Sequence, residues 1–138
     1  MDGDDALEEL SGRVIGAAIE VHRALGPGLL ESSYLSCLAA ELLERRVPYR
    51  AQVPLSLNYR GRPAGCAYRM DLVVGDRLLV EAKAVDSFHP LHTAQVLTYL
   101  RLSGLRLGLL INFNSIRLAE GIRRIALQLP PRPPRPPR

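Results

Sequence analysis

The sequence lacks the features that mark a secreted or membrane-bound protein. Its only two cysteines, Cys37 and Cys66, lie far apart and form no CxxC pattern, which favours free, reduced thiols over a disulfide or a metal site. No apolar run approaches the roughly 18 residues of a membrane span. The first residues are acidic, which is wrong for a signal peptide. We therefore expect a cytoplasmic protein that makes no use of a membrane.

Lysine is almost absent as well. Of the 18 lysine and arginine residues, only Lys83 is a lysine. An ammonium is a compact point charge on a flexible stem, so it can approach a single oxygen in a way that a guanidinium cannot. Glu81 lies two residues before Lys83 in a strongly apolar segment, where charged residues are rare unless they are paired or functional. We expect the chemistry of the protein at this pair.

Charge is unevenly distributed along the chain. Residues 1–9 carry five acidic side chains, residues 130–138 carry three arginines, and the segment between them carries 15 basic and nine acidic side chains. A basic body of this kind can accommodate a polyanion such as nucleic acid, although the charge can equally serve to solvate the surface. There is no tryptophan, and two phenylalanines with five tyrosines are few for base stacking. Any nucleic acid would then be selected by its ends or backbone shape rather than by base sequence.

The chain divides into one domain, residues 1–129, and a short tail, residues 130–138. A length of 138 residues suffices for a single hydrophobic core. The tail alternates proline pairs with arginine and cannot form a helix or sheet, so we expect an extended, disordered polyproline II segment. It looks like a ligand for an SH3-type domain. A protein partner for the tail and a solvated extension without function both stay open.

Hydrophobic periodicity predicts an α/β domain. Spacings of three and four predict helices, period-two or continuous apolar runs predict strands, and glycine or proline separates them. The expected helices cover 7–25, 31–46 and 90–102, and the expected strands cover 49–57, 64–74, 77–85, 105–113 and 121–129. The first three strands are expected to be joined by hairpins, at Asn58–Gly61 and around Gly75-Asp76. This order predicts a mixed sheet flanked by helices.

Two carboxylates should meet on one of these hairpins. A three-residue loop, Gly75-Asp76-Arg77, would set Asp71 directly opposite Glu81, whereas a two-residue loop would shift the register by one. Opposed side chains share a face, with Cβ atoms about 4.5–5.5 Å apart, and Lys83 lies on that face too. Two adjacent acids repel unless a cation separates them, and few hard oxygen ligands suit Mg²⁺. The alternative is a buried Glu81–Lys83 ion pair, with Asp71 at a strand end.

Two helical patterns can complete such a site. Glu31 and Tyr34, in the pattern Gly28-x-x-Glu31-x-x-Tyr34, are spaced to share one side of a first helical turn. His92, Gln95 and Tyr99 are spaced to share a face of the helix that follows Lys83. Taken alone, the first pattern can be a glutamate that complements the helix dipole, and the second a solvated polar face.

Together these segments resemble the GxxExxY protein family, a branch of the PD-(D/E)xK nuclease-like superfamily. The resemblance covers about Val14 to Ile125. It is carried by IGAAIEVH at 15–22, LGPGLLESSY at 25–34, YRMDL at 68–72, VEAKAV at 80–85, HTAQ at 92–95 and GLLINF at 108–113. The Glu81-x-Lys83 pattern alone would not be specific, but the combined motifs are.

The resemblance implies a restriction-endonuclease-like αβββαβ core. It implies that Asp71, Glu81 and the backbone carbonyl of Ala82 bind Mg²⁺ or Mn²⁺, and that Lys83 meets the attacking water or the phosphoryl oxygens. Glu31 would supply an acid from the helix. Gln95 and Tyr99 match a Q-x-x-x-Y element of exonuclease-like branches, and Gly28, Tyr34 and His92 would support the site.

The activity that follows is metal-assisted hydrolysis of a phosphodiester in nucleic acid, with DNA a more expected substrate than RNA. Because one scaffold can carry proteins without catalysis, two alternatives stay open. One is a catalytically silent module that binds nucleic acid or a nucleotide, and the other is an interaction protein that uses its Pro-Arg tail. The sequence leaves open the physiological substrate, exo or endo action, and the oligomeric state.

Overall fold

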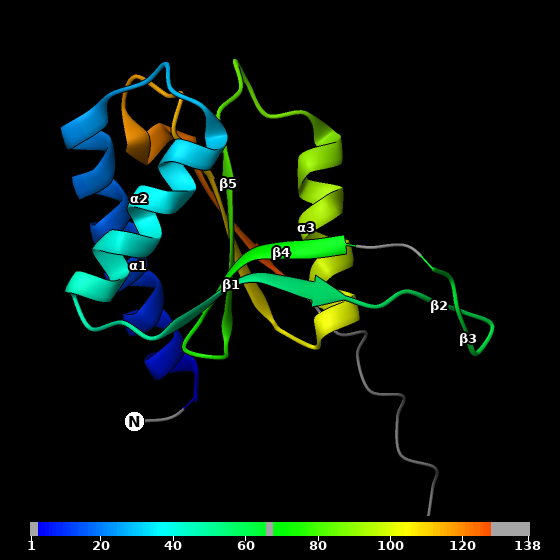
Figure 1. The fold of residues 1–138 in the computed structure, drawn as a ribbon. Helices are drawn as coiled ribbons and strands as arrows, with labels where there is room; N and C mark the ends of the chain where they lie inside the picture. The colour runs from blue at the N-terminus through cyan, green and yellow to red at the C-terminus, as the bar shows by residue number, and fades with distance from the viewer. Residues whose placement is uncertain (1–2, 66–67, 128–138) are drawn as a thin grey trace, which may run out of the picture.

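The computed structural model describes residues 3–65 and 68–127, which form three layers. Helices α1 (Gly3–Leu25) and α2 (Glu31–Glu44) cover one face of a five-stranded sheet. Helix α3 (Pro90–Ser103) covers the other face (Figure 1). The fold is therefore a mixed α/β domain, consistent with the restriction-endonuclease-like class expected from the sequence.

The sheet has the strand order β1-β4-β5-β6-β7. Its members are β1 (Tyr49–Leu55), β4 (Tyr68–Val74), β5 (Leu78–Lys83), β6 (Leu107–Asn112) and β7 (Ile122–Ala126). Only β5 and β6 run parallel, and α3 forms the crossover that a parallel pair requires. A short 3₁₀ helix, η1 (Leu118–Gly121), leads into β7.

Two hydrophobic cores hold the layers together. Val80 and Ala82 of β5 pack in the core under α1 and α2, whereas Leu79 packs in the core under α3. This alternation buries both faces of β5, which explains why its sequence is almost continuously apolar. A polar side chain on the Leu79 face of β5 therefore points toward α3.

The turn between β4 and β5 confirms the predicted register. Leu72 pairs with Val80 and Val74 pairs with Leu78, so three residues, 75–77, form the loop. Gly75 and Asp76 both take positive φ, at 58° and 56°. A two-residue loop would have moved every side chain of β5 to the opposite face of the sheet.

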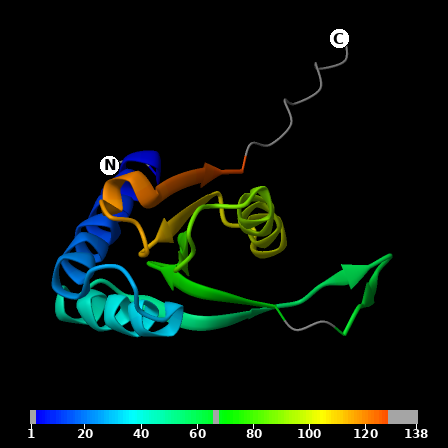
Figure 2. The ribbon, with the colours of Figure 1, turned by 90° about the horizontal axis from the view of Figure 1, so that it is seen from above.

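The connection from β1 to β4 differs from the simple hairpin expected at Asn58–Gly61. β1 ends at Leu55, and the chain then forms a separate two-stranded hairpin from β2 (Asn58–Tyr59) and β3 (Arg62–Pro63). Figures 1 and 2 both show this hairpin projecting from the body on the side of α3. The turn signal in the sequence was real, but it belongs to this additional hairpin.

Two expectations fall partly or wholly outside the described residues. The last predicted strand, 121–129, is observed as β7 from Ile122 to Ala126, and positions 128 and 129 of that prediction lie outside the described residues. The tail 130–138 lies outside them entirely. Among the described residues, no helix is both long and apolar enough to cross a bilayer.

Close packing of α3 on β6 gives a stability test. A Cβ atom added at Gly108 would lie 2.8 Å from Val96 Cγ1, and a short branched side chain cannot move aside. Gly108→Ala should destabilise the protein by about 1–3 kcal/mol, as overpacking of a core does. Gly12→Ala on α1 is the matched control, because no atom lies within 4 Å of its added Cβ. Urea unfolding should show the control unchanged or stabilised, and equal effects of the two changes would contradict this packing.

Candidate active site

Asp71 lies where β4 and β5 separate, and hydrogen bonds to side chains replace the backbone hydrogen bonds between the two strands there. The pairing of the two strands ends at Leu72 and Val80. Beyond that point the Asp71 N–H donates to Glu81 Oε2 at 2.7 Å, and the Ala82 N–H donates to Asp71 Oδ2 at 2.9 Å. Each carboxylate is thus held by the backbone of the opposite strand. These two reciprocal hydrogen bonds place both acids side by side in the gap between the diverging strands.

Glu81 is buried beside a second negative charge. Only 3% of its surface is exposed, and burial together with the Asp71 charge raises the pKa of Glu81 to about 9. Within the described residues, no arginine or lysine forms an ion pair with either carboxylate. Asp71 Oδ1 and Glu81 Oε1 accept no hydrogen bond from an N–H group in the described part of the chain, and a hydrogen bond between the two carboxyl groups contributes to the raised pKa of Glu81. The pair therefore presents carboxyl oxygens that a cation could bind in place of the Glu81 proton.

Lys83 turns toward α3 instead of pairing with Glu81. Its Nζ donates to Gln95 Oε1 at 3.1 Å, and Gln95 Nε2 donates to Tyr99 OH at 3.1 Å. Burial, and next the Glu81 charge, raise the pKa of Tyr99, so its phenol stays neutral. The structure thus contains a Lys83–Gln95–Tyr99 chain rather than a Glu81–Lys83 ion pair. One donor of the ammonium is used, and two remain.

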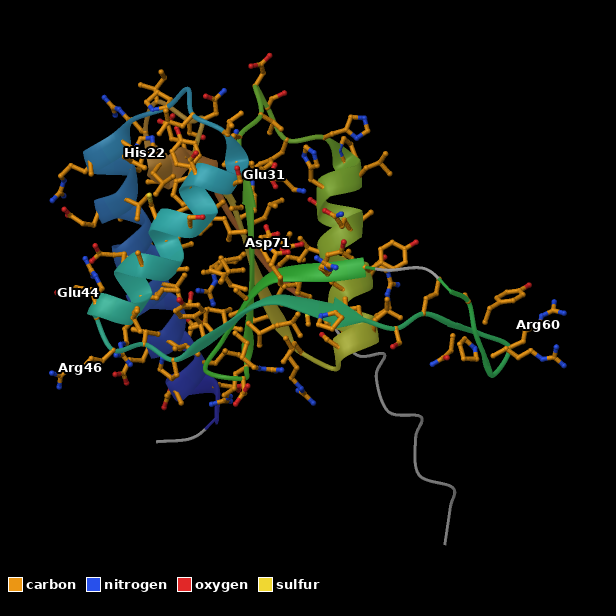
Figure 3. All side chains as sticks on the ribbon, in the orientation of Figure 1. His22, Glu31, Glu44, Arg46, Arg60 and Asp71 are labelled. Atoms are coloured by element: carbon orange, nitrogen blue, oxygen red, sulfur yellow. The ribbon has the colours of Figure 1, made fainter. Side chains whose placement is uncertain are left out.

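Glu31 reaches the rim of the site from the other face of the sheet. It is the first residue of α2 and is exposed. Burial of its carboxyl raises the pKa of Glu31, the Lys83 charge opposes this, and the Asp71 charge adds to it. Figure 3 shows Glu31 at the start of α2 and Asp71 on β4. Glu31 therefore lies in the electric field of the site, although within the described residues it forms no hydrogen bond to Asp71, Glu81 or Lys83.

Tyr34 does not share the outward face of Glu31. It is fully buried, stacks on Phe113 with ring centroids 4.8 Å apart, and donates its hydroxyl proton to the Gly26 carbonyl. Gly28, with φ at 103°, donates its N–H to Asn114 Oδ1 at 3.0 Å. Glu31 and Tyr34 were expected to share one side of the first helical turn, but the Tyr34 ring is buried in the core whereas Glu31 is exposed. Both residues instead fix the loop from which Glu31 projects.

His92 caps the N-terminus of α3. Its Nδ1 accepts a hydrogen bond from the His89 N–H at 3.0 Å, and His89 Nδ1 accepts one from the Leu91 N–H. These bonds satisfy helix-end amides that would otherwise have no partner. Desolvation, and next the Lys83 charge, lower the pKa of His92. His92 is thus a neutral capping residue close enough to Lys83 to feel its charge.

Sequence reasoning missed two asparagines that position the site. Asn112 lies beside Lys83 in the parallel register and is 4% exposed. Its amide accepts from the Val85 N–H at 3.0 Å and donates to the Val85 carbonyl at 2.8 Å, which fixes the chain just beyond Lys83. Asn114 also holds Gly28. The available signal was a polar residue, Asn112, at the end of the apolar run 105–113.

The donor set fits a divalent cation with few protein ligands. Asp71 and Glu81 offer hard oxygens, and Mg²⁺ is typically bound by one or two carboxylates together with water and phosphate oxygens. In residues 3–65 and 68–127, no three His, Cys, Asp or Glu side chains come together as a metal site. The role of the Ala82 carbonyl stays a prediction.

A family model of the PD-(D/E)XK nuclease superfamily matches residues 8–125. The chain belongs to this superfamily. No curated protein and no solved structure gave a significant match. Membership in this superfamily suggests a nuclease-like function, and it does not establish the GxxExxY branch.

The buried Glu81 carboxyl of this superfamily member, beside Asp71, makes stability depend on pH. The pKa of Glu81 rises from its ordinary value of 4.5 to about 9 in the folded protein, so the folded state keeps a proton that the unfolded chain releases. Stability should therefore fall as pH rises between these values. Glu81→Gln removes the group that titrates and keeps an oxygen that can accept the hydrogen bond from the Asp71 N–H. In EDTA we expect the variant to melt roughly 5–10 °C above wild type near pH 8.

The advantage of Glu81→Gln should disappear at pH 4 and grow steadily toward pH 9. Glu9→Gln, on the exposed side of α1, provides the control for loss of a carboxylate elsewhere. Parallel melting curves for Glu81→Gln and wild type across this range would show that Glu81 is not a buried, protonated acid.

Proposed function

We propose that the protein is a metal-dependent nuclease that hydrolyses phosphodiester bonds of nucleic acid. The observation that carries the proposal is the pair of backbone-anchored carboxylates, Asp71 and Glu81, with the single lysine of the chain on the same face of β5. Superfamily membership supports the same reaction class. Such a site has the parts required for hydrolysis assisted by a divalent ion.

Asp71 and Glu81 would hold Mg²⁺ or Mn²⁺, which supplies Lewis-acid activation of the phosphoryl group and of water. Their positions are fixed before any ligand arrives, because each accepts a hydrogen bond from the opposite strand. Pre-organised groups need no rearrangement when charge develops in the transition state. The two carboxylates therefore act as rigid oxygen ligands.

Lys83 would orient water and neutralise charge on the phosphoryl oxygens. Gln95 holds its Nζ on one side, and Tyr99 in turn holds Gln95, so the ammonium has a defined direction with two free donors. Glu31, at the rim, would assist as an acid or base toward water or the leaving group. Burial raises the pKa of Glu31, which is the direction that proton transfer near neutral pH requires.

Substitutions separate cation binding from hydrolysis. Lys83→Met removes the ammonium and keeps the length of the side chain, so it should retain Mn²⁺ binding in calorimetry and lose cleavage by about 100-fold or more. Asp71→Asn should lose both. Cleavage is measured on linear and circular, single- and double-stranded DNA and RNA, in Mg²⁺, Mn²⁺ or EDTA. The preferred substrate also tests the predicted preference for DNA.

Cleavage by Lys83→Met at the wild-type rate would show that Lys83 does not have the proposed role. Cation binding by wild type without cleavage of any of these substrates would favour the alternative, a silent module that binds nucleic acid. Arg13→Met, an exposed change on α1, controls for the loss of one positive charge on the other side of the sheet.

A further inference from the structure

The β2–β3 hairpin, residues 58–63, has a sequence that the fold does not explain. Its two strands pair with each other and take no part in the main sheet. All six residues are exposed, including Tyr59 with 65% of its surface accessible. Large exposed aromatic residues on a projecting element are typical of a binding surface rather than of a core. The hairpin thus contributes surface and little burial.

Arg60, at the tip of this hairpin, has a backbone conformation that arginine rarely adopts. Arg60 and Gly61 both take positive φ, at 52° and 78°, the conformation of a two-residue turn that normally carries Asn, Asp or Gly at its first position. A long side chain there costs about 1 kcal/mol relative to glycine. The Arg60 guanidinium lies over the Tyr59 ring, 5.3 Å from its centroid. The tip therefore presents an ordered cation that folding does not require.

The segment that carries the hairpin has basic side chains and no acidic ones. Residues 51–70 contain three arginines, Arg60, Arg62 and Arg69, and no acidic residue. Among the described residues, no carboxylate pairs with Arg60, Arg62 or Arg69. Helix α3 has no acidic residue along its length either. Asp4, Asp5, Glu8 and Glu9 lie on α1, which is across the sheet from the hairpin (Figure 1).

An apolar cavity connects the base of the hairpin to the candidate active site. The cavity measures about 330 Å³, and its lining includes Leu57 and Tyr68 from the segments that flank the hairpin. Gln95 and Tyr99, which position Lys83, line the same cavity. A strand that leaves Lys83 along α3 would therefore reach the hairpin. Figure 3 shows Arg60 at the far end of this path.

We propose that the β2–β3 hairpin is a nucleic-acid contact that holds the phosphate backbone of the substrate, with Arg60 and Arg62 as the contacting cations. The inference rests on the proposed function, because it states where the substrate of that site lies. Arginine recognises phosphate oxygens through paired donors, and such contacts position a substrate without reading its sequence. The acid-free surface fits this polyanion.

A charge-neutral hairpin with better turn chemistry tests the proposal. Arg60→Asn suits the positive φ and Arg62→Gln keeps a polar side chain, so the double variant should melt no lower than wild type. Arg13→Gln with Arg23→Gln on α1 removes the same charge from the opposite side of the molecule. Binding is measured by fluorescence anisotropy of a labelled DNA duplex in EDTA, where cleavage does not interfere, at several salt concentrations.

We expect the hairpin variant to bind roughly tenfold more weakly at low salt. Its slope of log affinity against log salt should be smaller by about two, one unit for each lost phosphate contact. The α1 variant should keep the wild-type slope. Equal behaviour of the two variants, or no binding of the duplex by wild type, would overturn the proposal.

A second readout separates this proposal from the nuclease function. Hydrolysis of bis(p-nitrophenyl) phosphate in Mn²⁺ needs the reacting groups but no nucleic-acid backbone, so the hairpin variant should retain it fully. Loss of this hydrolysis in the hairpin variant would overturn the assignment of the hairpin to backbone binding. Absence of hydrolysis in wild type would count against the nuclease, while the anisotropy slopes would still decide the role of the hairpin.

Discussion

The reciprocal hydrogen bonds between Asp71 and Glu81 are the constraint on which the site depends. An antiparallel ladder normally continues through backbone groups, but here the strands separate after Leu72 and Val80, and two carboxylates take the place of carbonyl acceptors. The backbone amides thereby keep their partners, as buried donors must. The same bonds turn the side chains into fixed oxygen donors. Strand divergence and site formation are thus one structural event.

Other polar contacts hold Lys83 and the loop before Glu31 near the gap between the two strands. Asn112 fixes the chain just after Lys83, Gln95 and Tyr99 hold the ammonium from α3, and Tyr34 with Asn114 holds the loop before Glu31. These supporting contacts come from both sides of the sheet. The candidate site can therefore use side chains from helices on opposite faces of the sheet.

The sequence predicted the element order, the Gly75–Arg77 turn and the register of Asp71 with Glu81, because period and turn chemistry determine these locally. It failed where contacts remote in sequence decide. The β2–β3 hairpin arose because the chain after Leu55 continues outward instead of reversing at once. Tyr34 turned inward because Phe113, 79 residues away, offers it a stacking partner. The positioning role of Asn112 depends on the course of Val85, which periodicity does not reveal.

The protonated state of Glu81 links the site to the proton concentration around it. With its pKa raised to about 9, Glu81 carries a proton at neutral pH, and a cation that takes this carboxylate as ligand must displace that proton. In the proposed nuclease, metal uptake would then be an exchange of one ion for another. The affinity for the metal would rise as the solution becomes more alkaline, by up to about tenfold for each pH unit.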